Sequence, residues 1–351
     1  VPEGAPPAAA LAGTPDFLRS RVGAKPAGGR YLQLYAADLG RGPDGRWWVL
    51  DDRTQAPSGA GYALQNRLVV SRAYPALYNS MNVHRVAPFF DAFRKGLSEA
   101  GDRSDPRICL LTPGPFSQTY FEQAHLARYL GFLLVEGDDL VARDGKVYVR
   151  TIAGLKRADV ILRRVDADFL DPLELNTSSR LGTPGMLEAI REGGVAVMNM
   201  PGSGVMESRA LLGFMPQLAR RLLGEELKLP NVATWWCGQP RERDLVESTL
   251  EDLIVAPAFN TPNPDGGFAG PRLVADMSPD ERAAFIFQQQ RQGLPARARD
   301  RAARVFERGQ EGVREKGMIR SGQSVPCPGV NLRKTVCHAH VACHPRAPGL
   351  S

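Results

Sequence analysis

Two adjacent arginines are the residues best suited by type to bind an anion. Arg163 and Arg164 end a predicted strand and are followed by Asp166 and Asp168. A guanidinium presents several N–H donors in a planar fork that matches a carboxylate or a phosphate. The pair therefore predicts a contact to an anionic substrate, with a salt-bridged strand end as the structural alternative.

Two loops that begin where predicted strands end are further candidates. Thr112-Pro-Gly-Pro115 follows one strand, and Asn199 with Gly202-Ser-Gly204 follows another. Open α/β sheets bind ligands at the carboxyl ends of their strands, so both loops are expected to face a ligand. The helix after the first loop adds the polar residues Ser117, Gln118, Tyr120, Glu122 and His125. We expect His125 to be a hydrogen-bonded structural histidine rather than a catalytic base.

A loop of small residues, 55–62, is a third candidate. Pro57, Ser58, Gly59 and Gly61 carry little side-chain bulk, so a ligand can approach their backbone closely. Arg67 follows and is suited to contact a phosphate or a carboxylate. The structural alternatives are a plain turn for the loop, and helix capping or an ion pair for Arg67.

Cysteine and histidine gather near the C-terminus, at Cys337, His338, His340, Cys343 and His344. Thiolates and imidazoles bind zinc, but this spacing matches none of the usual paired-ligand patterns. We therefore predict no metal site there. Five cysteines without a secretion signal also argue against a disulfide framework.

Periodicity predicts the elements that position these residues. Tyr31–Asp38 and Trp47–Asp51 flank the turn signal Gly42-Pro-Asp-Gly45, which predicts a hairpin. Apolar residues at steps of three and four, from Val83 to Leu97, predict an amphipathic helix that ends near Gly101.

From Arg107 onward, apolar strands alternate with helices, and a small hairpin turns at Asp144-Gly145. Strands are predicted at Ile108–Leu111, Phe132–Glu136, Ala158–Arg164, Val195–Met198 and Leu253–Phe259, and helices at Gln118–Leu130, Met186–Arg191 and Arg209–Leu223. This alternation with short connections predicts an α/β fold with a parallel, doubly wound sheet.

Composition is that of an ordinary globular protein, with 43% hydrophobic and 23% charged residues in 351, about two domains of chain. No apolar run approaches the roughly 18 residues of a membrane-spanning helix. The N-terminus lacks the basic flank and apolar stretch of a signal peptide. We therefore expect a cytoplasmic protein with no membrane partner.

The net charge of +6 is confined to the tail. Residues 286–351 hold twelve Lys and Arg against four Asp and Glu, which leaves 32 basic and 34 acidic residues in the first 285. Binding of nucleic acid through excess positive charge is therefore a hypothesis for the tail alone.

Four long stretches carry a family resemblance. They are Val49–Arg67, Leu111–His125, Ile161–Pro172 and Asn199–Gly204. Over residues 28–285 the chain resembles a circularly permuted ATP-grasp protein of a bacterial group similar to glutathionylspermidine synthase.

The resemblance implies a ligase. Such proteins activate a carboxylate as an acyl phosphate with ATP and Mg²⁺, and an amine then displaces the phosphate. It implies an α/β fold that joins a parallel, doubly wound (pre-ATP-grasp-like) sheet domain to a partial circularly permuted ATP-grasp α+β domain. The implied substrates are a small-molecule or peptide carboxylate and an amine.

The resemblance also implies domain bounds and site residues. It divides the chain into the first part of the permuted ATP-grasp domain (29–105), the α/β substrate-side domain (106–230) and a partial ATP-grasp strand with its glycine loop (231–285). Composition and charge add a disordered lead-in (1–28) and a basic tail (286–351). The implied metal ligands are Asp38, Asp51 and Asp52. The implied cofactor contacts are Ser58, Gly59, Gly61, Asn66, Gly266 and Gly267, and the implied catalytic residues are Arg67, Arg163 and Arg164.

Several positions depart from the family pattern. Arg53 and Gln65 replace an amide and a carboxylate, and Ala256 stands where the family has a phosphate-binding lysine. Loss of a charged hydrogen bond of about 1.5–3 kcal/mol weakens binding by roughly 10- to 150-fold. Pro262 and Pro264 also remove N–H donors from the glycine loop. We therefore expect a degraded nucleotide site.

The tail lacks the strands that the family would continue with after residue 285. Its Arg-, Ala- and Gly-rich composition is typical of a shifted reading frame in GC-rich DNA, so we interpret it as foreign to the domain. The sequence therefore leaves three hypotheses for the function. The chain is a relative of the ligases, or it is a truncated, non-catalytic binding module. The third, nucleic-acid binding through the tail, is the one we do not expect. Whether the chain is an enzyme, and in what oligomeric state, stays open.

Overall fold

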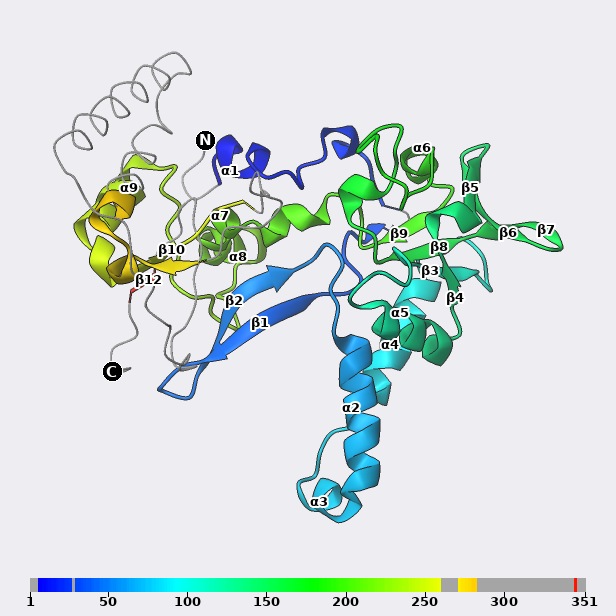
Figure 1. Ribbon diagram of the computed structural model, residues 1–351, viewed down its shortest axis with the longest axis horizontal. Coiled ribbons are helices and arrows are strands. Elements are labelled where there is room, and N and C mark those ends of the chain that lie inside the picture. Colours follow the sequence, from blue (N-terminus) through cyan, green and yellow to red (C-terminus); the bar gives the residue numbers. More distant parts are fainter. Residues whose placement is uncertain (1–5, 27–28, 260–270, 283–343, 346–351) are drawn as a thin grey trace, which may run out of the picture. The chain divides into compact units, whose positions relative to one another are not determined.

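The computed structural model describes residues 6–26, 29–259, 271–282 and 344–345 (Figure 1). Contacts along the chain divide it into two compact units. Unit 1 comprises residues 1–14, 39–51 and 208–351, and unit 2 comprises residues 15–38 and 52–207. Among the described residues, no helix is long and apolar enough to cross a membrane.

Unit 2 is built on a four-stranded parallel sheet. Its strands are β3 (Ile108–Leu111), β4 (Leu133–Val135), β8 (Val160–Arg163) and β9 (Ala196–Met198), in the order β4-β3-β8-β9. All three pairings are parallel. The continuously apolar strands that the sequence predicts are typical of a sheet covered on both faces. The predicted mixed α/β architecture with a parallel sheet is confirmed.

Alternate residues of the strands enter two separate hydrophobic cores. Cys109, Ile161 and Val197 belong to one core, whereas Leu110 and Leu162 belong to the other. This division follows from the two-residue period of a strand. Helix α6 (Met186–Arg191) packs into the first core, and helices α4 (Ala87–Ser98) and α5 (Tyr120–Leu130) pack into the second.

A three-stranded antiparallel sheet extends from the first core. It consists of β5 (Leu140–Arg143), β6 (Lys146–Thr151) and β7 (Gly154–Ala158), in that order. Asp144 and Gly145 both have positive φ, as a two-residue hairpin turn requires. The sequence predicts the first hairpin but not β7, whose short segment Gly-Leu-Lys-Arg-Ala is too polar to show a strand pattern.

The division of the chain into two units falls within the strands of a second hairpin, after Asp38 and after Asp51. This hairpin pairs β1 (Ala36–Arg41) with β2 (Trp47–Arg53). The predicted hairpin is confirmed, but its first strand begins five residues later than the expected Tyr31. The backbone N–H groups of Gln33 and Leu34 donate instead to the side chain of Asn199.

Two helices follow the hairpin in the sequence. Helix α2 (Ala60–Ala73) buries Gly61 and Leu64 near its start, and α3 (Pro75–Ser80) buries no residue. Leu68 and Val86 are partly buried against the second core of unit 2. The chain between these two residues therefore extends away from that core (Figure 1).

Unit 1 contains four α-helices and a small antiparallel sheet among its described residues. The helices are α1 (Ala8–Ala12), α7 (Arg209–Leu212), α8 (Met215–Leu223) and α9 (Pro240–Ser248). Strand β10 (Leu253–Val255) pairs with β11 (Arg272–Leu273) and with β12 (His344–Pro345). A core of eight buried residues, including Cys237 and Ala256, packs around β10.

Two segments of unit 1 differ from expectation. Residues 8–12 form α1, with Ala10 buried, where composition predicts a disordered lead-in. The single helix predicted over Arg209–Leu223 is divided after Leu212, because Pro216 in the first turn of α8 cannot continue a preceding helix. The Gly/Pro loop at 260–270 and the tail to residue 343 lie outside the described residues.

Candidate functional site

The segment 54–61 of unit 2 makes a series of contacts with residues at or after the carboxyl ends of β8 and β9. Arg164 directly follows β8, and Asn199 directly follows β9. Both side chains bond to this segment, as do residues from α5 and from the turn that follows Arg164. We call residues 54–61 the edge loop.

Asn199 fastens the start of the edge loop. Its amide oxygen accepts from the N–H groups of Gln33 and Leu34 at 2.8 and 3.1 Å. Its amide nitrogen donates to the carbonyl oxygens of Leu34 and Thr54 at 2.6 and 2.7 Å. Both donors of this buried amide are therefore used, so the structure gives it a backbone-fastening role.

Glu207 fastens the same end of the loop from the other side. One of its carboxylate oxygens accepts from the N–H groups of Thr54 and Gln55 at 2.6 and 2.5 Å. The Gln55 side chain in turn accepts from the N–H of Ala167 at 2.8 Å. Burial raises the pKa of Glu207 above its ordinary value. Sequence reasoning missed Glu207, since nothing in its local pattern marks a contact 153 residues away.

Glu122 on α5 holds the far end of the edge loop. Its Oε1 atom accepts from the N–H groups of Gly59 and Gly61 at 2.8 and 3.1 Å, and its side chain is fully buried. A Cβ on Gly61 would lie 2.6 Å from Cγ of Glu122, so only glycine permits this approach. Two N–H groups that sequence analysis assigns to a ligand are thus used within the protein.

Arg164 lies beside the same loop. Its Nη1 atom donates to the carbonyl oxygen of Pro57, and its Nη2 atom lies 4.0 Å from Oε1 of Glu122. Burial lowers the pKa of Arg164, and the Glu122 carboxylate opposes that shift. Within the described residues, Nε and Nη2 of Arg164 have no hydrogen-bond partner. Two donors of this buried arginine are therefore not used in hydrogen bonds within the described residues, although Nη2 is in ion-pair range of Glu122.

Arg163 differs from its neighbour, although sequence analysis treats them alike. It is 1% exposed and donates to the carbonyl oxygens of Asn199 and Val165 at 2.8 and 2.9 Å. Burial lowers the pKa of Arg163 to about 10, while Asp166 and Glu207 raise it. The structure thus places Arg163 as a buried brace between the chain segments after β8 and β9.

The other residues predicted to contact a ligand near the edge loop, Ser58, Asn66 and Arg67, differ in exposure and bonding. Ser58 and Asn66 have exposed side chains, and no hydrogen bond of the Ser58 hydroxyl is found within the described chain. Arg67 donates from Nη1 to the carbonyl oxygen of His84 at 3.0 Å and lies over the ring of Tyr78. Ser58 is therefore available to a ligand, whereas Arg67 joins two parts of its own chain.

The three predicted metal ligands each contact a different side chain. Asp38 accepts from Arg53 at 2.6 Å, and Asp51 accepts from Arg209 at 3.4 Å. Asp52 accepts from the Tyr35 hydroxyl at 2.7 Å, and burial raises its pKa. In the part of the chain that the structure describes, no three or more His, Cys, Asp or Glu side chains are arranged to hold a metal ion. Each aspartate is thus engaged by a neighbouring side chain, and a role for the three as Mg²⁺ ligands stays a prediction.

Of the three positions discussed for the phosphate-binding strand and glycine loop, Ala256, Gly266 and Gly267, the structure describes only Ala256. Ala256 directly follows β10, is 5% exposed and packs in the core of unit 1 with Val255 and Val274. A methyl group in that place contributes packing and no contact to phosphate. Gly266 and Gly267 lie outside the described residues.

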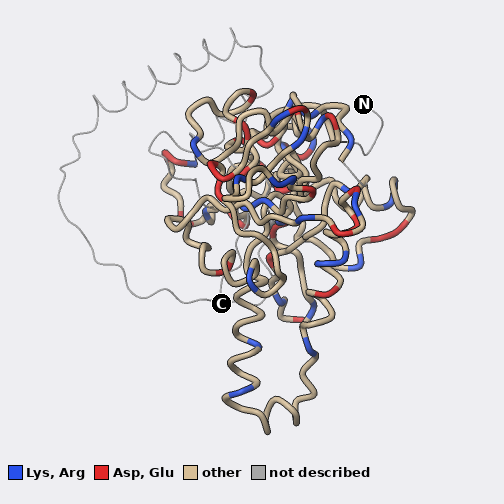
Figure 2. Tube along the Cα trace, turned by 90° about the vertical axis from the view of Figure 1, so that its right-hand side faces the viewer, with Lys and Arg blue, Asp and Glu red and all other residues tan. Residues whose placement is uncertain are grey.

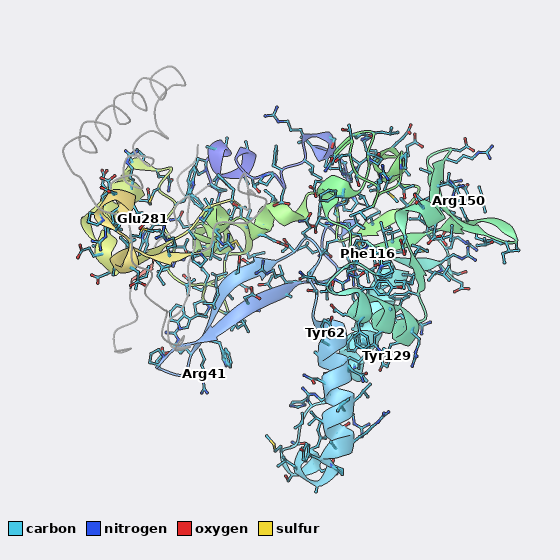
Figure 3. The ribbon with its side chains drawn as sticks, viewed as in Figure 1. Arg41, Tyr62, Phe116, Tyr129, Arg150 and Glu281 are labelled. Carbon is cyan, nitrogen blue, oxygen red and sulfur yellow. The ribbon has the colours of Figure 1, made fainter. Side chains whose placement is uncertain are left out.

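A row of aromatic rings runs along α5 from the start of α2. Tyr62 stacks on Phe121, which stacks on His125, and His125 contacts Tyr129. Figure 3 labels Tyr62 and Tyr129, the two ends of this row. His125 is thus held between two rings, but its buried Nε2 has no hydrogen-bond partner within the described residues, so the predicted hydrogen bond is not found.

Comparison with known proteins identifies the family. A family described as circularly permuted ATP-grasp type 2 matches residues 1–293. An uncharacterized protein of Mycobacterium tuberculosis is 44% identical over 255 residues, which are 72% of this chain and 29% of that protein. An uncharacterized protein of Synechocystis is 36% identical over 287 residues, which are 81% of this chain and 59% of that protein.

A third relative, an uncharacterized protein of Mycobacterium leprae, is 36% identical over 270 residues, or 76% of this chain and 47% of that protein. The chain thus spans between 29% and 59% of the length of these relatives. The family match covers most of the chain, including the edge loop and both arginines. The chain therefore belongs to the circularly permuted ATP-grasp type 2 family.

Proposed function

We propose that this chain is a relative of the ATP-dependent carboxylate–amine ligases, similar to glutathionylspermidine synthase, whose unit 2 binds the carboxylate substrate. Arg164 carries the proposal. It is a buried arginine at the carboxyl end of a parallel strand, with Nε and Nη2 unbonded within the described residues. Such a fork is suited to a carboxylate, and the exposed Ser58 hydroxyl lies on the loop that Arg164 contacts.

The nucleotide function is the weaker part of the proposal. By the family resemblance, ATP would supply the phosphoryl group that activates the carboxylate, and Mg²⁺ would offset the charge of its phosphates. Here Gly59 and Gly61 donate to Glu122, and Ala256 stands at the position of the implied lysine. We therefore propose that any binding of ATP is weak, and we assign no catalytic step to a metal.

Thermal unfolding tests both parts of the proposal. Protein alone is compared with protein plus millimolar ATP and Mg²⁺, and with protein plus a panel of small and peptide carboxylates. A ligand at 100 times its Kd stabilises the native state by about 2.7 kcal/mol, so binding is visible as a raised Tm. We expect at least one carboxylate to raise the Tm of the wild type and not that of Arg164→Met.

Arg128→Met is the matched control, because Arg128 is an exposed arginine on α5 that the proposal does not use. If no carboxylate raises the Tm, or if the shift persists in Arg164→Met, unit 2 does not bind substrate at this arginine. Absence of a shift with nucleotide would remove the ligase chemistry but not the carboxylate site.

A second candidate function is a non-catalytic binding module. The burial of Ala256 and the separate contacts of the three aspartates favour it. The two candidates differ in turnover, so release of ADP or phosphate with mixed carboxylates and amines decides between them. Any turnover above a nucleotide-only control would exclude the binding module.

A further inference from the structure

A projecting pair of helices in unit 2 takes no part in the candidate site. We call residues 69–85 the arm; it contains the last turn of α2, all of α3 and the return toward α4. Both Figure 1 and Figure 2 show it extending beyond the rest of unit 2. No residue of the arm is buried. Its exposed surface is therefore large for so short a segment.

The exposed side chains of the arm are strongly apolar. Val69, Val70, Tyr74, Leu77 and Met81 are each between 45% and 66% exposed. Single exposed apolar residues are common, but large exposed apolar groups gathered on one projection are typical of a binding surface. Burial of such side chains in a complex is favourable by about 25 cal/mol per Å².

The charge of the arm has one sign. From Thr54 to Phe90 the sequence contains no Asp or Glu. Arg72 and Arg85 are exposed, and neither forms an ion pair with a described residue. In Figure 2 the projection carries Lys and Arg colour and no Asp or Glu colour. A binding partner is therefore expected to be acidic.

The arm is held in shape before anything binds. Arg67 at its base donates to the carbonyl oxygen of His84 and lies over the ring of Tyr78. The N–H groups of Tyr78 and Met81 donate to the carbonyl oxygens of Tyr74 and Leu77, which continues the helical pattern around the turn. Less conformational entropy is then lost on binding.

We propose that the arm is the docking surface for another protein, whose contacting face combines acidic and apolar side chains. Pairing of two arms from two copies would place like charges together, which opposes association. Single-stranded nucleic acid is bound mainly through stacked aromatic rings, whereas four of the five exposed apolar side chains are aliphatic. An acidic protein face satisfies both the charge and the aliphatic surface.

Crosslinking in cells of the source organism tests the proposal. A photoreactive amino acid is placed at Leu77 or Met81 of the full chain, with Ile152 as the control site, a fully exposed residue of the same unit. We expect a protein adduct at the arm sites and not at Ile152. The adduct is identified by mass spectrometry, and that protein is purified for binding measurements.

Binding of the purified protein is then measured at 50 and 300 mM salt. We expect weaker binding at high salt, and a loss of at least about tenfold in Leu77→Asp and in Arg72→Glu. Ile152→Asp and Arg150→Glu, at matched exposed positions on β6 and in the turn that follows it, should bind as the wild type does.

Several results would overturn the proposal. They are the absence of an arm-specific protein adduct, equal binding by arm and control variants, and tighter binding at high salt. Arm-dependent binding to vesicles of phosphatidylglycerol and phosphatidylcholine, or to a 20-nucleotide oligo-dT, with no protein adduct, would assign the arm to a membrane or a nucleic acid instead.

Discussion

At the scale of single residues, Glu122 determines the conformation of the edge loop. Glu122→Ala removes the acceptor of the Gly59 and Gly61 N–H groups and leaves Arg164 without its nearby carboxylate. Removing one member of a buried ion pair costs about 3–5 kcal/mol. We expect a loss of that size in the free energy of unfolding, measured with urea.

Glu188→Ala on α6 is the matched control, since Glu188 is an exposed helical glutamate. It should change the free energy of unfolding by less than about 0.5 kcal/mol. Glu122→Gln keeps one oxygen acceptor, so its loss in the free energy of unfolding should lie between those of Glu122→Ala and Glu188→Ala. Equal stability of Glu122→Ala and wild type would show that the loop does not depend on this carboxylate.

Asp52 provides a test of pH dependence. Burial raises its folded-state pKa, so the folded state binds more protons than the unfolded state just above pH 3.8. Its contribution to stability is therefore fully present below pH 3.8 and is lost as pH rises through the folded pKa. Asp52→Asn keeps an acceptor for the Tyr35 hydroxyl and removes this titration.

Thermal unfolding of Asp52→Asn and wild type between pH 4 and pH 7 measures the effect. The Tm of the variant relative to that of the wild type should rise with pH and then become constant. A difference that stays constant over the whole range, or falls, would contradict the raised pKa. Addition of Mg²⁺ shows in addition whether this carboxylate contributes to a metal site.

Residue type alone could not separate Arg163 from Arg164. Sequence reasoning finds both, because two adjacent arginines at the end of a predicted strand can be recognised from the sequence alone. Their burial and bonding depend on Asn199, Pro57 and Glu122, which are distant in sequence. The predicted metal ligands show the same limit, since Asp51 is contacted by Arg209 and Asp52 by Tyr35, and neither contact is visible in the local sequence.

At the scale of elements, the contact of α2 with α5 determines where the edge loop ends. Gly61→Ala would place a Cβ 2.6 Å from Cγ of Glu122 and 3.0 Å from Cγ of Leu126. Overpacking of this kind costs about 1–3 kcal/mol. We expect a loss of that size in urea unfolding, together with faster amide exchange at Gly59, whose N–H bond to Glu122 would be strained.

Ala63→Leu is the control for this prediction. Ala63 is exposed on the same helix, so added volume there meets solvent rather than α5. It should leave the free energy of unfolding within about 0.5 kcal/mol of the wild type. If Gly61→Ala is equally neutral, α2 can move away from α5 without cost.

Most elements of unit 2 could be predicted, because a buried parallel strand is a short apolar run and its helices have clear periodicity. Strands β3, β8 and β9 and helices α5 and α6 lie within a few residues of the predicted bounds. The polar strand β7 could not be recognised, because its residues show no apolar alternation. It is held as a strand by its backbone pairing with β6. The break between α7 and α8 shows how a proline overrides an amphipathic pattern.

At the scale of the whole molecule, each unit has its own core, and the cores differ in size. Unit 2 has two large clusters of buried residues, whereas the described part of unit 1 has one cluster of eight. Stability from apolar burial grows with the buried area. Unit 1 is therefore expected to unfold at a lower urea concentration than unit 2.

One buried cysteine in each unit reports on this difference, since Cys237 lies in the core of unit 1 and Cys109 in the first core of unit 2. Burial raises the pKa of Cys109 to about 12, and only a thiolate is alkylated, so Cys109 should stay unlabelled in the native state at pH 8. Short pulses of iodoacetamide across a urea series, read by mass spectrometry of the two peptides, should label Cys237 at a lower urea concentration than Cys109. Coincident labelling would show that the units unfold together, and earlier labelling of Cys109 would reverse the order that core size predicts.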